Sequence, residues 1–463
     1  MEIIADLEVH SKYARAVSPS MTPPTIAEWA GKKGIGLVGT GDFTHPMWLR
    51  ELEANLEEAG EGVYKLKTED RRLKTEVKFL LTSEVSCMYT HEGKGRRVHL
   101  LVYLPDINSV KKFNSELSAH GANLFSDGRP IMGLSLSQVA QIALEANEKA
   151  LVIPAHVWTP WFGFYGHMSG YNSLKEAFGD MEKYIPAVET GLSSDPAMNW
   201  RIGELEGKQI VSFGDAHSPQ KLGREATVFE LPEVSYENIW KAMWSKSGVG
   251  RLKIDNEVGA SRTEVRTSDI NPQISYTIEF YPEEGKYHYT GHRKCNVVYS
   301  PNEARKKGMT CPVCGRSLTI GVMSRVEALA TSEVETASEI DKFGVRWIKT
   351  AHRVVDYLSR RPYVMLVPLL EILAESLESG VASQKVLSVY DHLVNKFEGE
   401  FSLLLKTPIN DINTEAGEKI AEAILKVRSG DIVIKPGYDG VFGKVAIWKE
   451  PSEEVTLDQE TLF

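Results

Sequence analysis

The sequence predicts an α/β fold for its first half, and three observations support this prediction. Short apolar runs alternate with helical patterns from the first residue to about residue 245. Several runs are continuously apolar, which is typical of strands buried on both faces. The segments between them carry helix start and stop signals. Strand–helix alternation over this length indicates either a barrel or a doubly wound sheet.

The individual elements can be placed from these patterns. The expected strands are IGLVGTG (35–41), VKFLLTSE (77–84), RVHLLVYL (97–104), ALVIPAH (150–156), IPAVET (185–190) and QIVSFGDAH (209–217). A helix is expected over TPPTIAEWAGKKG, which opens with prolines and ends at Gly34. SLSQVAQIALEANEK shows helical spacing and predicts another helix.

The second half has a different pattern. Residues 246–275 are polar and weakly patterned, so we expect a connection there, and ISYTIEFYP (274–282) alternates like a strand. Helical spacing recurs in VEALATSEVETASEI, WIKTAHRVVDYLSRR, VPLLEILAESL, KVLSVYDHLVNKF and TEAGEKIAEAILKVRSG. IVIKPGYDGVFGKVAIW predicts a hairpin that turns at Tyr438-Asp439-Gly440.

Composition limits the classes of protein. The chain has 463 residues, which favours two or three domains, and 42% of them are hydrophobic, enough to build a core. No apolar run approaches the roughly 18 residues of a membrane span. The first ten residues are too few and too acidic for a signal peptide, so we expect a cytoplasmic protein with no membrane contact. The net charge of −10 bounds the partners only weakly, because a basic face can be local.

His and acidic residues recur where the apolar runs begin or end. They are Asp6, Glu8, His10, Asp42, His45, Glu84, His99, His156, Glu189, Asp215 and His217. The carboxyl ends of strands meet at one rim of a barrel or sheet, so these groups would lie close together. His and carboxylate together suit Zn, Mn or Fe, and this number of groups would serve two or three ions. Metals about 4 Å apart suit phosphoester hydrolysis. A single such residue more often caps a loop, so the prediction rests on the set.

The order of these groups resembles the polymerase and histidinol phosphatase (PHP) superfamily over about residues 1–245. The resemblance implies a distorted (β/α)7 barrel that carries a multi-metal site and hydrolyses phosphoesters. It implies the metal ligands Glu8, His10, Asp42, Glu84, His99, His156, Asp215 and His217, with Asp215, His217 and Glu84 as catalytic residues. Glu8 departs from the superfamily pattern, which has His at this place. His45 stands three residues after Asp42, whereas Asp and His are adjacent in many members of the superfamily.

A second metal site is predicted near residue 300. His292-x2-Cys295 is followed after fifteen residues by Cys311-x2-Cys314, and four N and S ligands at such spacing define a structural zinc site. His288 is an alternative fourth ligand. The fourth cysteine, Cys87, stands alone and is expected to be a packed thiol.

The residues around this cluster are basic. Residues 286–316 contain seven Lys or Arg against one Glu. A solvated surface would explain this charge, but beside a phosphodiesterase-type site contact with a phosphate backbone is the better interpretation. RWIKTAHRVVDYLSRR adds a second basic segment.

Longer phrases narrow the family. GTGDFTHPMWLRELE, PAHVWTPWFG, ETGLSSDPAMNWR, GDAHSPQKLGRE, EEGKYHYTGHRKC and CPVCGRSLTIGV together resemble the endonuclease Q family over nearly the whole chain. The resemblance implies a DNA repair endonuclease that cleaves 5′ of deaminated bases (uracil, hypoxanthine, xanthine) and of abasic sites, in double- and single-stranded DNA. It also implies a nucleoid-associated location.

To read a deaminated base, such an enzyme takes the base out of the stack into a pocket. Aromatic and amide residues between the metal-type motifs are the expected pocket, although each of them could equally be core. The predicted pocket and DNA contacts are Trp161, Tyr171, Asn172, Asn199, Arg201, Arg293 and Lys294.

Four parts are therefore expected: a PHP-type catalytic domain (1–245), a connection and zinc module (246–325), a mainly helical DNA-binding domain with a terminal hairpin (326–450) and an acidic tail (451–463). The tail residues Gln459–Phe463 partly match a sliding-clamp (PCNA) docking box, Q-x-x-[LIM], without its aromatic pair. We expect a monomer.

Two other functions fit parts of the sequence. A small-molecule phosphatase resembling histidinol phosphatase would need neither the basic zinc module nor the helical region. A DNA-binding protein that does not catalyse is hinted at only by Glu8.

Overall fold

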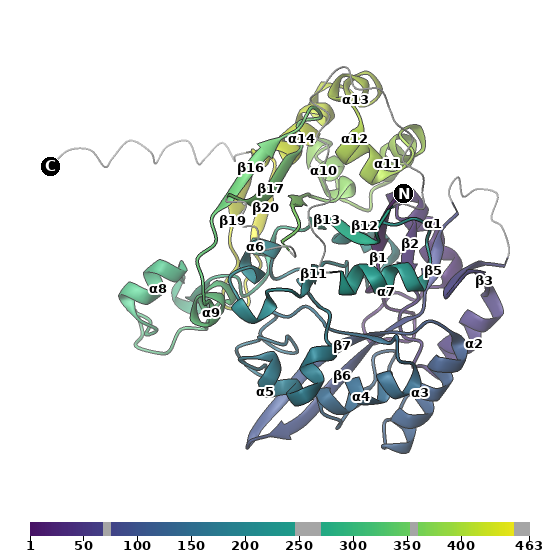
Figure 1. Ribbon diagram of the computed structural model, residues 1–463. Coiled ribbons are helices and arrows are strands. Elements are labelled where there is room, and N and C mark those ends of the chain that lie inside the picture. The colour runs from purple at the N-terminus through teal and green to yellow at the C-terminus, as the bar shows by residue number, and fades with distance from the viewer. Residues whose placement is uncertain (68–75, 246–269, 352–359, 449–463) are drawn as a thin grey trace.

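The structure is a computed structural model that describes residues 1–67, 76–245, 270–351 and 360–448 (Figure 1). Within these ranges, ten strands form one sheet in the order β16-β17-β18-β13-β12-β1-β2-β5-β4-β3. Their bounds are β1 Glu2–Asp6, β2 Leu37–Gly39, β3 Leu56–Gly60, β4 Val63–Leu66, β5 Lys78–Leu80, β12 Ala226–Glu230, β13 Gln273–Glu279, β16 Thr336–Ile340, β17 Arg346–Thr350 and β18 Tyr363–Met365. At its centre, β1, β2 and β5 run parallel and β12 runs antiparallel to β1.

A second sheet has the order β8-β6-β7-β9, and β10 pairs in parallel with β11. The bounds are β6 Thr82–His91, β7 Lys94–Tyr103, β8 Ile131–Met132, β9 Leu151–Pro154, β10 Ala187–Glu189 and β11 Gln209–Val211. Strand β6 starts two residues after β5 ends, so the chain passes directly from the first sheet into the second. Thr190 N donates to the carbonyl of Val211 and continues the pairing of β10 with β11.

The two sheets share one core of inward-facing side chains. Fully or almost fully buried residues come from almost every strand around it: Ala5, Leu37, Leu80, Leu101, Ile153, Ala187, Val211 and Phe229. These apolar groups fill the space below the strand ends, so polar side chains at the rim rest on a packed base.

Helices lie outside the strands of the first half (Figure 1). Their bounds are α1 Pro23–Lys33, α2 Pro46–Asn55, α3 Ile107–Ala119, α4 Leu136–Ala146, α5 Leu174–Phe178, α6 Pro196–Asn199 and α7 Tyr236–Trp244. Helix α4 starts with a capping box, in which Ser135 and Gln138 bond each other's backbone N–H groups. Short 3-10 helices are η1 Gly179–Tyr184, η2 Gly203–Leu205, η3 Pro219–Lys221, η5 Pro282–Glu284 and η6 Arg293–Cys295. The α/β class is confirmed, whereas closure into a seven-stranded barrel stays a prediction.

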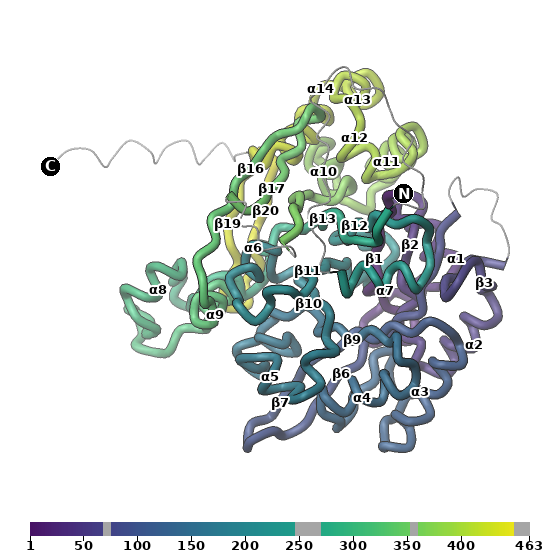
Figure 2. The backbone as a smooth tube through the Cα atoms, viewed as in Figure 1, coloured from purple at the N-terminus to yellow at the C-terminus, as the bar shows by residue number. Residues whose placement is uncertain are grey.

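The second half contains a projecting module and a helical cluster (Figure 2). The module holds β14 Thr290–His292, β15 Val297–Tyr299, α8 Pro301–Lys307 and α9 Val322–Leu329. The cluster holds α10 Leu369–Ser376, α11 Gln384–Lys396, α12 Glu400–Lys406, α13 Ile409–Ala416 and α14 Glu418–Ser429. The expected hairpin is present as β19 Val433–Lys435 and β20 Lys444–Ala446, with Asp439 and Gly440 at positive φ in its turn.

The helical prediction was wrong for two segments. Residues 336–340 and 346–350 are the antiparallel strands β16 and β17, which extend the main sheet through β18. The residues of β16 alternate between exposed and half-buried positions. Most of them are polar, and a polar strand of this kind resembles the exposed side of a helix in the sequence. Pairing across the sheet overrides that local signal.

Some predictions fall outside the described ranges. They include most of residues 246–275, the basic residues of the segment 352–359, and the tail with Gln459–Phe463. The helices in the described ranges are all too short or too polar to span a lipid bilayer.

Candidate metal centres and the adjoining pocket

Three strand-end loops deliver acidic and imidazole groups to one rim, and they share a backbone feature. Asp42, His156 and Asp215 all have positive φ, at 47°, 29° and 44°. Few residues other than glycine adopt this conformation, and such strain is concentrated at functional sites. Gly41 packs so closely that an added Cβ would lie 2.1 Å from the carbonyl oxygen of Val9. Glycine in these loops thus allows the backbone to pack closely on the neighbouring loop. The polar residue that follows can then point toward the rim.

Glu84, at the start of β6, stands in the middle of the rim. Its Oε1 lies 2.5 Å from His99 Nδ1 and 3.1 Å from His156 Nε2. Its Oε2 lies 3.1 Å from His10 Nε2 and 3.0 Å from Arg129 Nη1. Burial acts to raise the pKa of Glu84, but Arg129 and His99 lower it well below its usual range. Glu84 is therefore an anionic group that reaches two sets of imidazoles, as a bridging ligand does.

His10 joins a second part of the rim. Its Nε2 lies 3.1 Å from Asp215 Oδ1, while its Nδ1 lies 3.1 Å from Asp42 Oδ1. The other oxygen of Asp42 accepts a hydrogen bond from the backbone N–H of Ser11. Asp42 thus stands behind His10 and orients its ring, and a role for Asp42 as a direct ligand stays a prediction.

The rim contains three overlapping groups whose possible ligand atoms lie within 4.8 Å of one another. They are His10, Asp215 and His217; Glu84, His99 and His156; and Glu8, Glu84 and Asp215. His45 stands apart from these groups, stacked on Tyr13 with ring centroids 4.5 Å apart. Seven of the eight predicted rim ligands are therefore brought together.

Glu8 supplies the test of whether a metal fits this site. Both of its carboxylate oxygens are buried and have no hydrogen-bond partner among the described residues. Burial, followed by repulsion from Glu189, Asp215 and Glu84, raises the pKa of Glu8 well above its usual range. An unpaired buried carboxylate is costly unless a cation neutralises it. The mixed carboxylate and imidazole donors fit divalent ions such as Zn²⁺ or Mn²⁺.

Glu189, at the end of β10, borders the same group. It accepts a hydrogen bond from the backbone N–H of His156, and its Oε1 is buried without a partner. Burial raises the pKa of Glu189 to about 7. Asp6 lies deeper, accepting hydrogen bonds from the N–H groups of Gly214 and Gly223, and so fixes the GDAH loop.

Sequence reasoning missed three residues at the rim. Arg129 contacts Glu84, Thr159 Oγ1 lies 2.9 Å from His156 Nδ1, and the Phe162 ring packs on His99 at 4.5 Å. Thr159 and Phe162 lie in the phrase WTPWF, whose aromatic residues predict a base pocket and not a contact with the metal-type groups. Arg129 follows no apolar run, so periodicity could not have found it.

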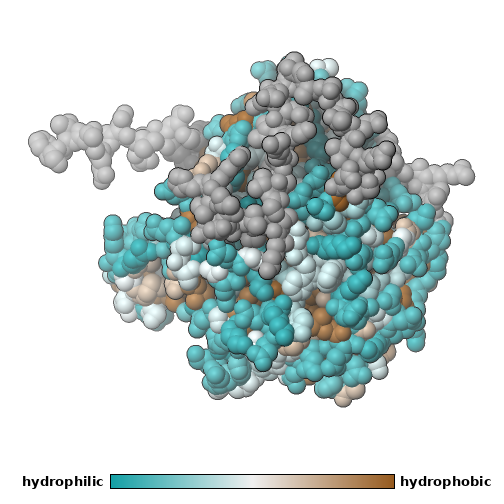
Figure 3. Space-filling view, viewed as in Figure 1, coloured by the Kyte–Doolittle hydropathy of each residue, from teal (hydrophilic) through white to brown (hydrophobic). Residues whose placement is uncertain are grey.

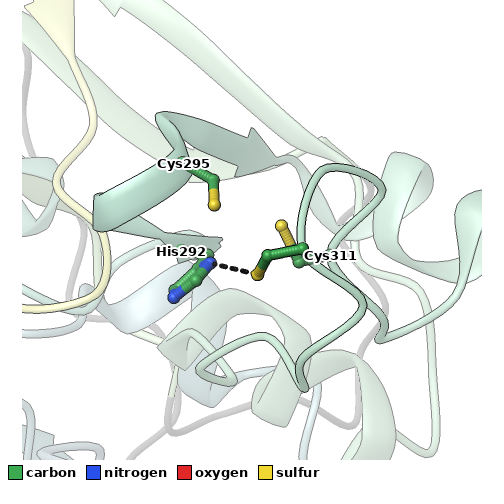
Figure 4. A group of neighbouring side chains, drawn as sticks. His292, Cys295 and Cys311 are labelled. Carbon is green, nitrogen blue, oxygen red and sulfur yellow. Dashed lines mark hydrogen bonds between the residues drawn. The ribbon is translucent and has the colours of Figure 1, made fainter.

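The four predicted zinc ligands converge in the projecting module. The ligand atoms of His292, Cys295, Cys311 and Cys314 lie within 4.8 Å of one another, and His292, Cys295 and Cys311 point toward a common centre (Figure 4). His288 is not part of this group, because its ring is buried and stacks on Tyr289. The geometry favours a tetrahedral structural site.

Basic side chains cover the outside of this module. All seven Lys and Arg of residues 286–316 are exposed: Lys286, Arg293, Lys294, Arg305, Lys306, Lys307 and Arg316. Two are neutralised locally, since Arg305 pairs with Glu327 and Lys307 with Glu303. Hydrophilic side chains dominate the described surface on the face that Figure 3 shows.

A pocket of about 250 Å³ lies between the rim and the module. Its lining includes Thr159, Trp161, Lys286, Tyr287 and His288. The rings of Trp161 and Tyr287 meet edge to face with centroids 5.3 Å apart. Thr159 lines the pocket and also contacts His156, so a single residue separates the pocket from the metal-type groups.

Of the seven residues predicted for the base pocket and the DNA contacts, Trp161 lines this cavity and the other six do not. Tyr171 is buried, with its OH bonded to Tyr89 and the Arg96 guanidinium over its ring. Asn199 is buried and bonded to Trp158 and Ser194.

Asn172 and Arg201 also serve other contacts. The Asn172 side chain accepts a hydrogen bond from Arg325, and Arg201 pairs with Glu327 on α9 at 2.7 Å. Both residues tie the first half of the chain to the module.

Comparisons with known proteins show which family the chain resembles. Residues 368–431 match the family model of the MJ0043 C-terminal domain. The uncharacterized protein MJ0043 of Methanocaldococcus jannaschii is 29% identical over 313 residues, which is 65% of this chain. The chain spans 33% of the length of that relative.

Two solved structures match along the full chain. The lesion-specific endonuclease PfuEndoQ from Pyrococcus furiosus is 31% identical with a TM-score of 0.76, and the match covers 100% of both chains. An endonuclease Q in complex with a 27-mer duplex substrate, with an abasic lesion at the active site, is 32% identical with a TM-score of 0.75. That match covers 98% of this chain and 100% of the other. Identity and coverage of this extent show that the chain belongs to the endonuclease Q family.

Proposed function

We propose that the protein is a metal-dependent DNA repair endonuclease that cleaves the phosphodiester bond 5′ of deaminated bases (uracil, hypoxanthine, xanthine) and of abasic sites. The observation that carries the proposal is the buried cluster around Glu84, in which the unpaired carboxylate of Glu8 lies near Glu84, Asp215 and several imidazoles. Full-length similarity to an endonuclease Q solved with abasic DNA supports the substrate class.

The rim residues Glu8, His10, Glu84, His99, His156, Asp215 and His217 would hold two or three divalent ions, with Asp42 orienting His10. When bound, such ions activate water and stabilise the charge that develops on the phosphoryl oxygens. Glu84 and Asp215 each belong to two of the three groups, so each could serve more than one ion.

The cleavage reaction is a hydrolysis. The oxygen of a water molecule forms a bond to phosphorus as the P–O3′ bond breaks in line, and the departing oxygen takes up a proton. The products are a 3′-hydroxyl and a 5′-phosphate on the lesion side. The His217 side chain is 34% exposed against 1% for His10, so His217 is the more accessible of these two imidazoles.

The damaged base would leave the stack and enter the pocket lined by Trp161 and Tyr287. Aromatic rings bind any base by stacking, and Lys286, Arg293 and Lys294 on the adjoining module offer positive charge to the backbone. Docking of the tail Gln459–Phe463 to a sliding clamp stays a separate prediction.

The decisive test compares two substrates. A labelled duplex with one abasic site or one uracil, and a phosphomonoester, are incubated with the protein and divalent metal. We expect a nick at the lesion only. Release of phosphate from the monoester without any nick would favour a small-molecule phosphatase and overturn the proposal.

Asp215→Ala tests the rim directly. We expect the variant to lose cleavage and to retain most DNA affinity, which separates chemistry from binding. Asp180→Ala is the matched control, because the Asp180 side chain is 98% exposed and pairs with Lys175. Unchanged cleavage by Asp215→Ala would exclude the rim as the catalytic site.

A further inference from the structure

Among the described lysines and arginines, Arg129 is the one whose charged group contacts a carboxylate of the rim. Its Nη1 lies 3.0 Å from Glu84 Oε2, and the structure gives no other hydrogen bond to this guanidinium among the described residues. The guanidinium group of an arginine keeps its positive charge over the whole range of physiological pH. A permanent cation therefore stands beside the groups that would hold the metals.

The loop that carries Arg129 is built into the site. Asp127 Oδ1 accepts hydrogen bonds from the backbone N–H groups of Arg129 and Arg15, at 3.2 and 3.1 Å. Gly128 N donates to the carbonyl of Tyr13, and an added Cβ at Gly128 would lie 2.4 Å from Asp42 Oδ2. The loop is thus hydrogen-bonded to, and packed against, the segment that follows His10. These contacts fix the position of the Arg129 backbone beside the rim.

The guanidinium is also open to a ligand. The Arg129 side chain is 24% exposed, whereas Glu84 beneath it is 1% exposed. A guanidinium group has five N–H donors in a planar fork, which matches the oxygens of a phosphate group. A purely structural partner of Glu84 would need one donor and no access to solvent.

We propose that Arg129 binds a non-bridging oxygen of the phosphate that is cleaved, and so stabilises the negative charge that gathers there during hydrolysis. The proposal rests on the proposed function, since it assigns a substrate contact at the same site. Arg129 acts beside the metals as a fixed positive group aimed at the developing charge.

The test uses Arg129→Gln and Arg129→Lys in the full chain, with Arg50→Gln on the exposed side of α2 as the control. Single-turnover cleavage is measured on an abasic duplex, and on two duplexes whose cleaved phosphate carries sulfur at one or the other non-bridging position. Metal content and duplex affinity are measured on each variant. We expect Arg129→Gln to cleave on the order of 100-fold more slowly with metal content kept. Arg129→Lys should lie between, because it keeps the charge but not the fork.

The sulfur substrates separate substrate contact from support of Glu84. With Arg129→Gln, the slowing caused by sulfur should shrink at one position and stay unchanged at the other. The proposal is overturned if this variant cleaves like the native protein, if it loses metal together with activity, or if both sulfur effects are unchanged. If the native protein does not nick the duplex at all, the proposed function fails first, and the assignment of Arg129 fails with it.

Discussion

His10 turns its Nδ1 toward Asp42, 3.1 Å away, and this contact leaves Nε2 facing Asp215 and Glu84. The Asp42 carboxylate fixes both the tautomer and the direction of the ring. Such partners behind a ligand change metal affinity less than the ligand itself does.

Asp42→Asn should therefore weaken metal binding at the rim about 10- to 100-fold without abolishing it. The measurement is a competition titration with a chelator, and Asp106→Asn, at the start of α3, is the control. A complete loss of binding, equal to that of Asp215→Ala, would instead identify Asp42 as a direct ligand.

Glu8→Gln should have opposite effects on the metal-free and the metal-loaded protein. Without metal, removal of a buried carboxylate that faces Glu189, Asp215 and Glu84 should raise the melting temperature. With metal, the variant should gain less stability than the native protein, because one anionic donor is lost. Thermal unfolding with and without chelator measures both effects, and equal metal-induced shifts in the two proteins would contradict a ligand role.

Cys311→Ser should destabilise the projecting module. Cys311 is 1% exposed and packs with Val297, Tyr299, Ala304 and Leu318, so metal binding and the small core of the module depend on each other. We expect loss of about one zinc per chain and a lower melting temperature. Elemental analysis checks the zinc content, with Cys87→Ala as a cysteine control away from the module, and thermal unfolding of Cys311→Ser checks the stability. Retention of zinc would contradict the site.

His288 should make stability depend on pH below neutrality. Burial lowers the pKa of His288 to about 4, with a hydrogen bond to the Pro282 carbonyl partly opposing it. The unfolded chain takes up a proton near pH 6.5 and the folded chain does not, so the stability contribution is complete above 6.5 and falls as pH drops toward 4. Between pH 6.5 and 5 the loss is about 2 kcal/mol.

His288→Asn should remove this part of the pH dependence in denaturant unfolding. The exposed His120→Asn serves as the control. The same slope in His288→Asn and in the native protein would show that the acid sensitivity arises elsewhere, for example at the zinc-type group.

The sequence by itself predicted several strands and helices of the first half and most of the groups that meet at the rim. Continuous apolar runs that end in Asp, Glu or His predict buried strands with polar residues at their ends. When such strands surround one core, their ends meet at the same rim. His292, Cys295, Cys311 and Cys314 were also predictable, because two short turns of fixed spacing form most of that site locally.

The tertiary structure alone decided the rest. It placed β16 and β17 in the main sheet, since strand pairing over long distance outweighs local helical spacing. It directed Tyr171 and Asn199 into the core and brought Tyr287 from the module to Trp161. It also set Arg129 against Glu84 across 45 positions of sequence. Contacts of this kind depend on which loops cross the rim, and neither periodicity nor motif spacing encodes that arrangement.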